Sequence, residues 1–162
     1  VFATVHVVGS ENDLEPWSGL PGGDQPEARL AEFADRQQAA LAWIDAAFDA
    51  AEGTTGPADR ARPGTPAGRA AGVLLLMQAE PVDSPGFAAI RARIAERAAQ
   101  YGGPVLLVHG DEHVYEVEPG YAGVPNLTRL ETYGDTATEW LRLTVDPRQE
   151  DVFSWTTRHV TG

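Results

Sequence analysis

Residues 73–78 read Val-Leu-Leu-Leu-Met-Gln, and residues 104–109 read Pro-Val-Leu-Leu-Val-His. Each stretch is apolar at successive positions, which is typical of a strand that is buried on both faces of a parallel sheet. A third strand is predicted at 2–8, where a β-rich run ends in Gly9, and His6 inside it is expected to be a core group. These three strands predict the sheet around which the chain is arranged.

Helical patterns separate the three strands. The longer helix is expected at 26–52, with Asp24 as its cap and Glu27 three residues later, as in a capping box. Its apolar stripe consists of Leu30, Phe33, Ala34, Leu41, Ile44, Phe48 and Ala51. A second helix is expected at 84–101, and the Gly/Pro-rich residues 53–72 are expected to form a flexible surface insertion. Strands joined through helices favour parallel pairing and an α/β core.

Beyond Gly110 the pattern changes to short strand-like segments with turn residues between them. These segments are 113–117, 126–133, 139–145 and 152–160. We therefore predict an α/β fold of the form βαβαβ followed by antiparallel strands, in a single domain over 1–162. Because a core strand is predicted at the very start of the chain, we expect this domain to be incomplete, with a further part preceding Val1.

The composition narrows the possible chemistry. The 162 residues include 24 acids against 12 bases, all of them arginine, for a formal net charge of −12. Sparse bases argue against binding nucleic acid or an anionic membrane, and the longest apolar run, 73–77, is too short to span a bilayer. The absence of Lys and Cys excludes P-loop, Schiff-base and thiol chemistry. Metal-assisted hydrolysis or binding remains.

Polar residues follow each of the three predicted strands. The first strand leads into Gly9–Asp13, the second into Gln78–Pro81 and the third into His109–His113. Ligands of open α/β sheets bind beyond the carboxyl ends of the strands, so these segments are expected to converge. Carboxylate, amide and imidazole groups from separate strand ends suit a divalent metal ion. The same residues are also ordinary turn formers, and that alternative stays open.

Four segments carry a resemblance to a known family. They read Val-His-Val-Val-Gly-Ser-Glu-Asn-Asp at 5–13, Leu-Leu-Leu-Met-Gln-Ala-Glu-Pro at 74–81, Val-Leu-Leu-Val-His-Gly-Asp-Glu-His at 105–113 and Asn-Leu-Thr-Arg-Leu-Glu-Thr-Tyr-Gly at 126–134. In this order they resemble the second half of calcineurin-like metallophosphoesterases, closest to a divergent bacterial branch. The resemblance implies one half of that family's four-layer α/β/β/α sandwich, and a fragment without the two N-terminal metal-binding motifs.

The resemblance assigns roles to residues at the strand ends. Asn12 matches the metal-ligating amide of the family's Gly-Asn-His-Asp/Glu motif, and Asp13 stands where the family has a histidine near the leaving group. Gln78 stands in place of a metal-ligating histidine. In the family's Gly-His-x-His motif, Asp111 replaces the first histidine and His113 matches the last. The implied metal ligands are therefore Asn12, Gln78, Asp111 and His113.

The departures from the family pattern change the expected metal. Amide and carboxylate oxygens are harder ligands than imidazole, so Mn²⁺, Mg²⁺ or Ca²⁺ is favoured over Zn²⁺, in a dinuclear site when the protein is complete. Asp13 is the implied acid toward the leaving alcohol, with His109 as the alternative. Arg129 is expected to bind phosphate through its two-pronged guanidinium, although pairing with Glu131 or Glu116 is the other interpretation.

The expected function is metal-dependent hydrolysis of a phosphate ester, with a phosphorylated small molecule or ester as the substrate. The isolated chain is expected to be inactive, because the first two metal-binding motifs of the family are missing from it. The alternative is a degenerate relative that binds a phosphorylated ligand or a partner without turnover, since Asp13, Gln78 and Asp111 fill positions that are histidines in the family. The sequence is compatible with the cytoplasm and with export, and it leaves the oligomeric state open.

Overall fold

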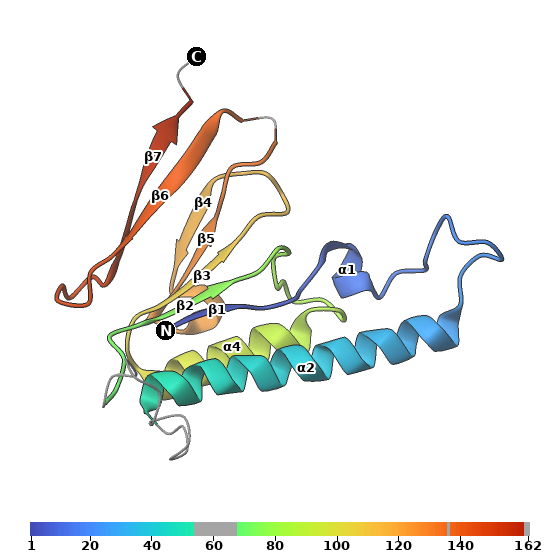
Figure 1. Cartoon of the computed structure of the whole chain (residues 1–162), viewed down its shortest axis with the longest axis horizontal. Helices are drawn as coiled ribbons and strands as arrows, with labels where there is room; N and C mark the ends of the chain where they lie inside the picture. Colours follow the sequence, from blue (N-terminus) through green and yellow to red (C-terminus); the bar gives the residue numbers. More distant parts are fainter. Residues whose placement is uncertain (54–67, 136, 161–162) are drawn as a thin grey trace, which may run out of the picture.

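The computed structural model describes residues 1–53, 68–135 and 137–160 (Figure 1). Its strands are β1 (Phe2–Thr4), β2 (Val73–Leu76), β3 (Val105–His109), β4 (Glu116–Pro119), β5 (Leu127–Glu131), β6 (Glu139–Val145) and β7 (Phe153–His159). Its helical elements are α1 (Gly9–Asp13), α2 (Pro26–Glu52), α4 (Ala88–Tyr101) and the 3-10 turn η1 (Tyr121–Gly123). The protein is therefore of the α/β class, as the alternation of strands and helices predicts.

Five strands form one mixed sheet in the order β1-β2-β3-β5-β4. The strands β1, β2, β3 and β5 are parallel, and β4 is antiparallel to β5. Leu75 at the centre of β2 pairs with Ala3 on one side and with Leu107 on the other. The prediction of antiparallel strands after β3 is wrong for β5, because β4 and η1 carry the chain back across the sheet before β5 begins. The carboxyl ends of β1, β2 and β3 consequently lie side by side.

The two faces of this sheet have different covers. The helices α2 and α4 pack on one face, where Ile44, Phe48, Ile90 and Ile94 are fully buried together with Leu75 and Leu107 of the sheet. The hairpin β6–β7 packs on the other face, where its Leu141, Leu143, Phe153 and Trp155 lie against Leu74, Leu106 and Leu130. Figure 1 shows the helices and the hairpin on opposite sides of the sheet. This double cover explains why β2 and β3 are apolar at successive positions.

Several local expectations need correction. Helix α2 has the predicted bounds, but Asp24 does not cap it, because its carboxylate accepts hydrogen bonds from the Trp17 backbone and the Arg29 guanidinium instead. The N-terminal part of α2 extends past the sheet (Figure 1), and Leu30 of the predicted stripe is 50% exposed there. The second helix begins at Ala88 and not at residue 84.

The first strand is shorter than predicted, since β1 ends at Thr4, and His6 beyond it is exposed and not a core group. The predicted surface insertion at 53–72 falls mostly on residues 54–67, which lie outside the described residues. Within the described ranges, none of the helices is both long and apolar enough to cross a membrane.

Candidate active site

The ends of β1, β2 and β3 meet at one edge of the sheet, as the sequence predicts. The backbone N–H of Gly110 donates to the Gln78 carbonyl oxygen over 3.1 Å, and that of Ala79 donates to the Val7 carbonyl oxygen over 3.2 Å. These bonds continue the sheet pairing past the strands themselves. The side chains of Gln78, which is exposed, and Asp111, which is half-buried, are joined by a hydrogen bond of 2.8 Å from Nε2 to Oδ1.

Gly9 leaves a space in front of this pair. A Cβ atom on Gly9 would lie 3.3 Å from Asp111 Oδ1 and 3.9 Å from Gln78 Oε1. A carboxylate oxygen and an amide oxygen from different strands thus border the position where any other residue would place a side chain. Both are hard oxygen donors, which suits Mn²⁺, Mg²⁺ or Ca²⁺. Gln78 and Asp111 are the two predicted metal ligands that the structure brings together.

The backbone is strained at two of these strand ends. Seven non-glycine residues in the described part of the chain have positive φ, and six of them are Ser10, Glu11, Asn12, Asp13, Asp111 and His113. The element α1 is a left-handed turn, with φ between 54° and 57° at Ser10, Glu11 and Asn12. The left-handed conformation costs about 1–2 kcal/mol for each such residue. Strain of this kind concentrates at functional sites, where the surrounding structure compensates for it.

Tertiary contacts hold α1 in this conformation. The Asn12 side chain is buried, donates through Nδ2 to the Gly86 carbonyl oxygen over 3.1 Å, and accepts a hydrogen bond from Arg36 at Oδ1. Arg36 also donates to the Asn12 carbonyl oxygen over 2.6 Å, and the Gly86 N–H donates to Glu11 Oε2 over 3.2 Å. The amide of Asn12 therefore faces α2 and the start of α4, away from the Gln78–Asp111 pair.

The other predicted site residues lie around this edge with partners of their own. Asp13 Oδ2 accepts a hydrogen bond of 3.0 Å from the Trp17 indole N–H. The His113 Nδ1 atom lies 3.1 Å from Asp135 Oδ1, and both side chains are more than half exposed. Asp13 and His113 are thus accessible at the strand ends, whereas His109 and Arg129 are buried.

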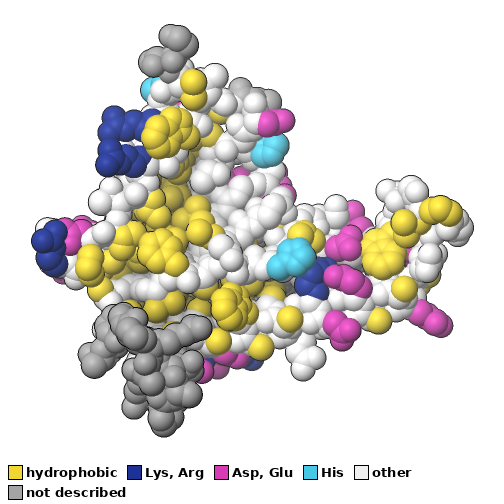
Figure 2. Space-filling view, viewed as in Figure 1, with side chains coloured by type: hydrophobic (Ala, Val, Ile, Leu, Met, Phe, Trp, Pro, Cys, Tyr) yellow, Lys and Arg dark blue, Asp and Glu magenta, His cyan; other side chains and the backbone are white. Residues whose placement is uncertain are grey.

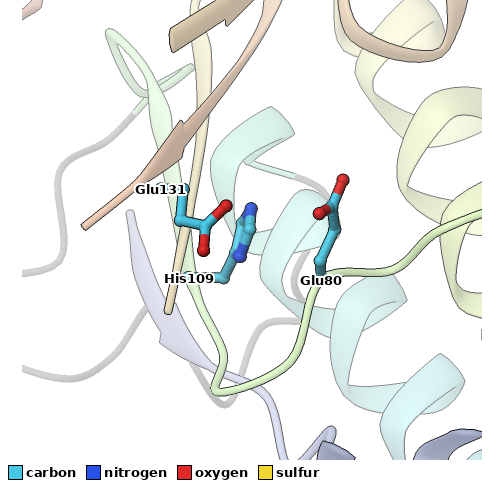
Figure 3. Close-up of side chains that lie close together, drawn as sticks. All are labelled: Glu80, His109 and Glu131. Atoms are coloured by element: carbon cyan, nitrogen blue, oxygen red, sulfur yellow. The ribbon is translucent and has the colours of Figure 1, made fainter. Parts of the chain in front are cut away.

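His109 and Arg129 belong to a charged cluster with Glu80 and Glu131 on the helix-facing side of the sheet. Figure 3 shows Glu80, His109 and Glu131 of this cluster. One donor atom from each of Glu80, His109 and Glu131 lies within 4.8 Å of the others. By their donor types these three side chains could hold a metal ion. However, Arg129 Nη1 lies among them, 3.1 Å from Glu80 Oε1 and 3.2 Å from His109 Nε2. The cluster already contains a cation.

The hydrogen-bond partners of His109 indicate which of its ring nitrogens donates and which accepts. Because a guanidinium only donates, the Nε2 atom of His109 accepts from Arg129. The Nδ1 atom, 2.6 Å from the Gly110 carbonyl oxygen, is then the one that carries the hydrogen. Both ring nitrogens of His109 are therefore engaged between β5 and the turn after β3, and Nε2 faces Arg129.

Arg129 pairs with acids from two other parts of the fold and from its own strand. Its guanidinium contacts Glu116 at 2.6 Å and Glu118 at 3.0 Å, both on β4, besides Glu80 and Glu131. Burial lowers the pKa of Arg129, but the hydrogen bond to Glu116 and the charge of Glu80 outweigh it, so the net pKa is raised. To bind phosphate as expected, Arg129 would have to exchange these carboxylates for phosphate oxygens. The alternative interpretation from the sequence was a pairing with Glu116, and the structure contains that pairing.

We expect Glu80 to make the free energy of unfolding change with pH. Burial raises the pKa of Glu80 above its ordinary value of 4.5, and the charge of Arg129 only partly offsets this. The folded protein therefore takes up this proton at a higher pH than the unfolded chain, so in the window just above pH 4.5 stability falls as the pH rises. Urea unfolding of the wild type and of Glu80→Gln measures this effect. The free energy of unfolding of the wild type minus that of the variant should be larger at pH 5 than at pH 8. The same difference at both pH values would contradict the prediction.

Glu80 and Glu131 were not predicted as site residues. The sequence offers one signal: Arg129 and Glu131 are two residues apart in the strand-like segment 127–131, which places two opposite charges on the same face of a strand. Charged residues are rarely buried unless they are paired, so this pattern indicates a buried ion pair. Which other acids join the pair depends on β4 and the loop after β2, and no local pattern reports that.

Comparisons with protein-family models, with curated proteins and with solved structures found no match to this chain. The fold and the site therefore define the class of protein by themselves: an α/β protein with a mixed, mostly parallel sheet, whose adjacent strand ends bear a carboxylate–amide pair, a strained turn and an exposed histidine.

Proposed function

We propose that this protein is a metal-dependent phosphoric ester hydrolase of the calcineurin-like metallophosphoesterase type. The observation that carries the proposal is the Gln78–Asp111 pair, whose oxygens border the space beside Gly9 at the carboxyl ends of three adjacent parallel strands. This is the location at which open α/β sheets bind ligands. The concentration of strained backbone in the same segments supports it, as does a sheet covered by helices on one face and by a β-hairpin on the other.

Asp111 and Gln78 would hold the ion through oxygen atoms. A divalent ion bound there would polarise phosphate oxygens and lower the pKa of a bound water. Asn12 and His113 would join the ligand set only if α1 and the His113–Asp135 pair rearranged, because their side chains now bind other groups. The substrate class is a phosphorylated small molecule or ester.

Asp13 is the better candidate for the acid that protonates the leaving alcohol. It lies at the end of α1 with its carboxylate held by the Trp17 indole, so its position is defined. The His109 imidazole is buried and has both nitrogens engaged, by Arg129 and by Gly110. A general acid must reach the reacting oxygen directly or through one water, which favours the accessible residue.

The second candidate function is ligand binding without turnover, by a protein of the same type. The inward orientation of Asn12 favours it, because that amide is satisfied by Arg36 and Gly86 and does not face the Gln78–Asp111 pair. Under this alternative, a phosphorylated compound binds at the strand ends without a metal ion and is released unchanged.

Titration with Mn²⁺ tests the metal site. We expect saturable binding in calorimetry, and Asp111→Asn should weaken it by about tenfold or more, on the scale of losing one oriented partner of a metal site. The control is Asp151→Asn, an exposed carboxylate in the β6–β7 turn, which should leave the affinity unchanged. Equal affinities for the two variants, or no binding of Mn²⁺, Mg²⁺ or Ca²⁺, would contradict the proposed site.

Hydrolysis of p-nitrophenyl phosphate tests the reaction, with the wild type and Asp111→Asn measured side by side. Metal-dependent release of p-nitrophenol that Asp111→Asn abolishes is the expected result. Metal-independent binding of phosphate compounds without any release in either sample would replace the hydrolase by the second candidate.

A further inference from the structure

A surface pocket of about 510 Å³ opens beside α1. Its wall includes Ser10 and Asp13 of α1, followed by Glu15, Trp17 and Leu20 of the segment that leads to α2. Ser10 is the neighbour of Gly9, which faces the Gln78–Asp111 pair. The pocket therefore adjoins, through Ser10, the segment that borders the proposed metal position, and Asp13, the proposed acid, lies in its wall. A volume of this size is typical of small-molecule sites.

Hydrogen bonds to α2 hold the wall of the pocket in place. The Trp17 backbone N–H donates to Asp24 Oδ1 over 3.0 Å, and its indole N–H donates to Asp13 Oδ2 over the same distance. Arg29, in the first turns of α2, binds Asp24 with two nitrogens and also donates to the Leu14 carbonyl oxygen. Both ends of the segment 13–24 are thus attached to the helix, and the half-buried indole has a defined orientation.

The charge of the pocket is negative. Asp13 and Glu15 contribute two carboxylates, and its lining includes no arginine or histidine. The two arginines nearest in the fold are engaged elsewhere, Arg29 with Asp24 and Arg36 with Glu32 and Asn12. Figure 2 shows acidic side chains beside hydrophobic ones at the end of the molecule formed by α1 and the start of α2. An indole face with carboxylates beside it is the environment that binds organic cations, through cation–π and Coulomb attraction.

We propose that this pocket is the subsite for the alcohol part of the substrate and that it takes an alcohol bearing an ammonium group. The inference deepens the proposed function, on which its substrate role rests: the phosphate would lie at the Gln78–Asp111 pair and the cationic group against Trp17. Esters whose alcohol is anionic are disfavoured, because the Glu15 carboxylate repels them. The substrate class is therefore an amino-alcohol phosphate ester.

Free choline is the probe, and 3,3-dimethyl-1-butanol, its neutral isostere, is the matched control ligand. Neither contains phosphate and neither needs a metal ion. Titrations are followed by NMR at the indole N–H signals of the four tryptophans, with the Trp17 signal assigned from Trp17→Phe. We expect choline to shift the Trp17 signal and to bind at least about tenfold more tightly than the isostere, the scale of one cation–π contact with an adjacent charge.

Two variants and a control locate the binding. Trp17→Leu should abolish choline binding, and Glu15→Gln, at an exposed position, should weaken it severalfold. Trp140→Leu, an exposed tryptophan on the hairpin, should change nothing. Equal affinity for the two ligands, choline binding that calorimetry still detects in Trp17→Leu, or no binding of choline to the wild type would overturn the proposal.

The two proposals fail separately. Choline binding at Trp17 without hydrolysis of any phosphate ester would leave an ammonium-binding pocket and remove the hydrolase. Hydrolysis of p-nitrophenyl phosphate without choline binding would leave the hydrolase and remove the pocket's role. If both hold, choline phosphate should be a better substrate than 3,3-dimethylbutyl phosphate by about the factor measured for the free alcohols.

Discussion

Replacement of Arg129 by methionine is expected to lower the free energy of unfolding by about 3–5 kcal/mol, the usual cost of removing one partner from a buried ion pair. Arg129 is 4% exposed, and its guanidinium is the only cation that contacts the buried Glu131 among the described residues. Without it, Glu131 and Glu80 would face each other and Glu116 with no opposite charge. Methionine fills much of the volume of the arginine stem, so the loss reports the charge and not a cavity.

Urea unfolding measures this effect. The matched control is Arg148→Met, because Arg148 is 85% exposed and binds Asp146 alone through its side chain. Exposed pairs contribute about 0–1 kcal/mol, so the control should be nearly neutral. Arg129→Lys should lie between the two, since one ammonium cannot reach carboxylates on β4, on β5 and in the loop after β2 simultaneously. A loss for Arg129→Met as small as that of Arg148→Met would show that the cluster is not stabilised by its cation.

The Arg129→Met variant also reveals whether the cluster is a metal site that arginine occupies. With Nη1 removed, donor atoms of Glu80, His109 and Glu131 within 4.8 Å of one another remain without their cation. A divalent ion that binds only the folded state stabilises it by mass action. We therefore expect Zn²⁺ or Mn²⁺ to restore part of the stability of this variant in the unfolding assay, and to do so less for the wild type.

Gly86→Ala is expected to disturb the candidate site most. A Cβ atom on Gly86 would overlap the backbone carbonyl of Glu11, and backbone cannot move aside as a flexible side chain does. Gly86 also binds α1 through the Glu11 carboxylate and the Asn12 amide. The variant should lose about 1–3 kcal/mol of stability, as overpacked sites do, and α1 should move away from the start of α4.

Two measurements check the Gly86→Ala prediction. Urea unfolding gives the loss of stability, and the Trp17 indole N–H signal reports the displacement, because Trp17 is bonded to Asp13 at the end of α1. Gly110→Ala is the control for stability, since its Cβ would meet the nearest atom, Thr132 Oγ1, at an ordinary 3.8 Å. If Gly86→Ala matches this control in stability and leaves the Trp17 signal in place, the contact between Gly86 and α1 is not what holds the turn.

Much of the fold was predictable from local pattern. The runs 73–78 and 104–109 are apolar at successive positions because β2 and β3 are covered by helices on one face and by the hairpin on the other. The bounds of α2 and β6 agree with the sequence because periodicity and turn residues act over a few positions. The direction of β5 was not predictable, since the same alternating residues suit either a parallel or an antiparallel neighbour.

Some features of the candidate site were likewise predictable from the sequence and others were not. Polar segments follow β1, β2 and β3, and they meet at one edge because these strands are parallel. The proximity of Gln78 and Asp111 was therefore predictable. The orientation of Asn12 was not, because a left-handed turn of non-glycine residues forms only where distant groups, here Arg36 and Gly86, compensate its strain. The partners of His109 and Arg129 were likewise undetermined beyond the pairing with Glu116 or Glu131.

The sequence by itself determined α2, β2, β3 and β6, the burial of β2 and β3, and the edge at which the polar strand ends gather, because those follow from periodicity and from the rule that parallel strands end together. The tertiary structure alone decided which charges meet. Arg129 on β5 binds acids from β4, from its own strand and from the loop after β2, segments up to 49 positions away in the chain, and only packing brings them within reach of one guanidinium. Local pattern records how deeply a residue is buried, whereas a buried charge is defined by partners that the fold supplies.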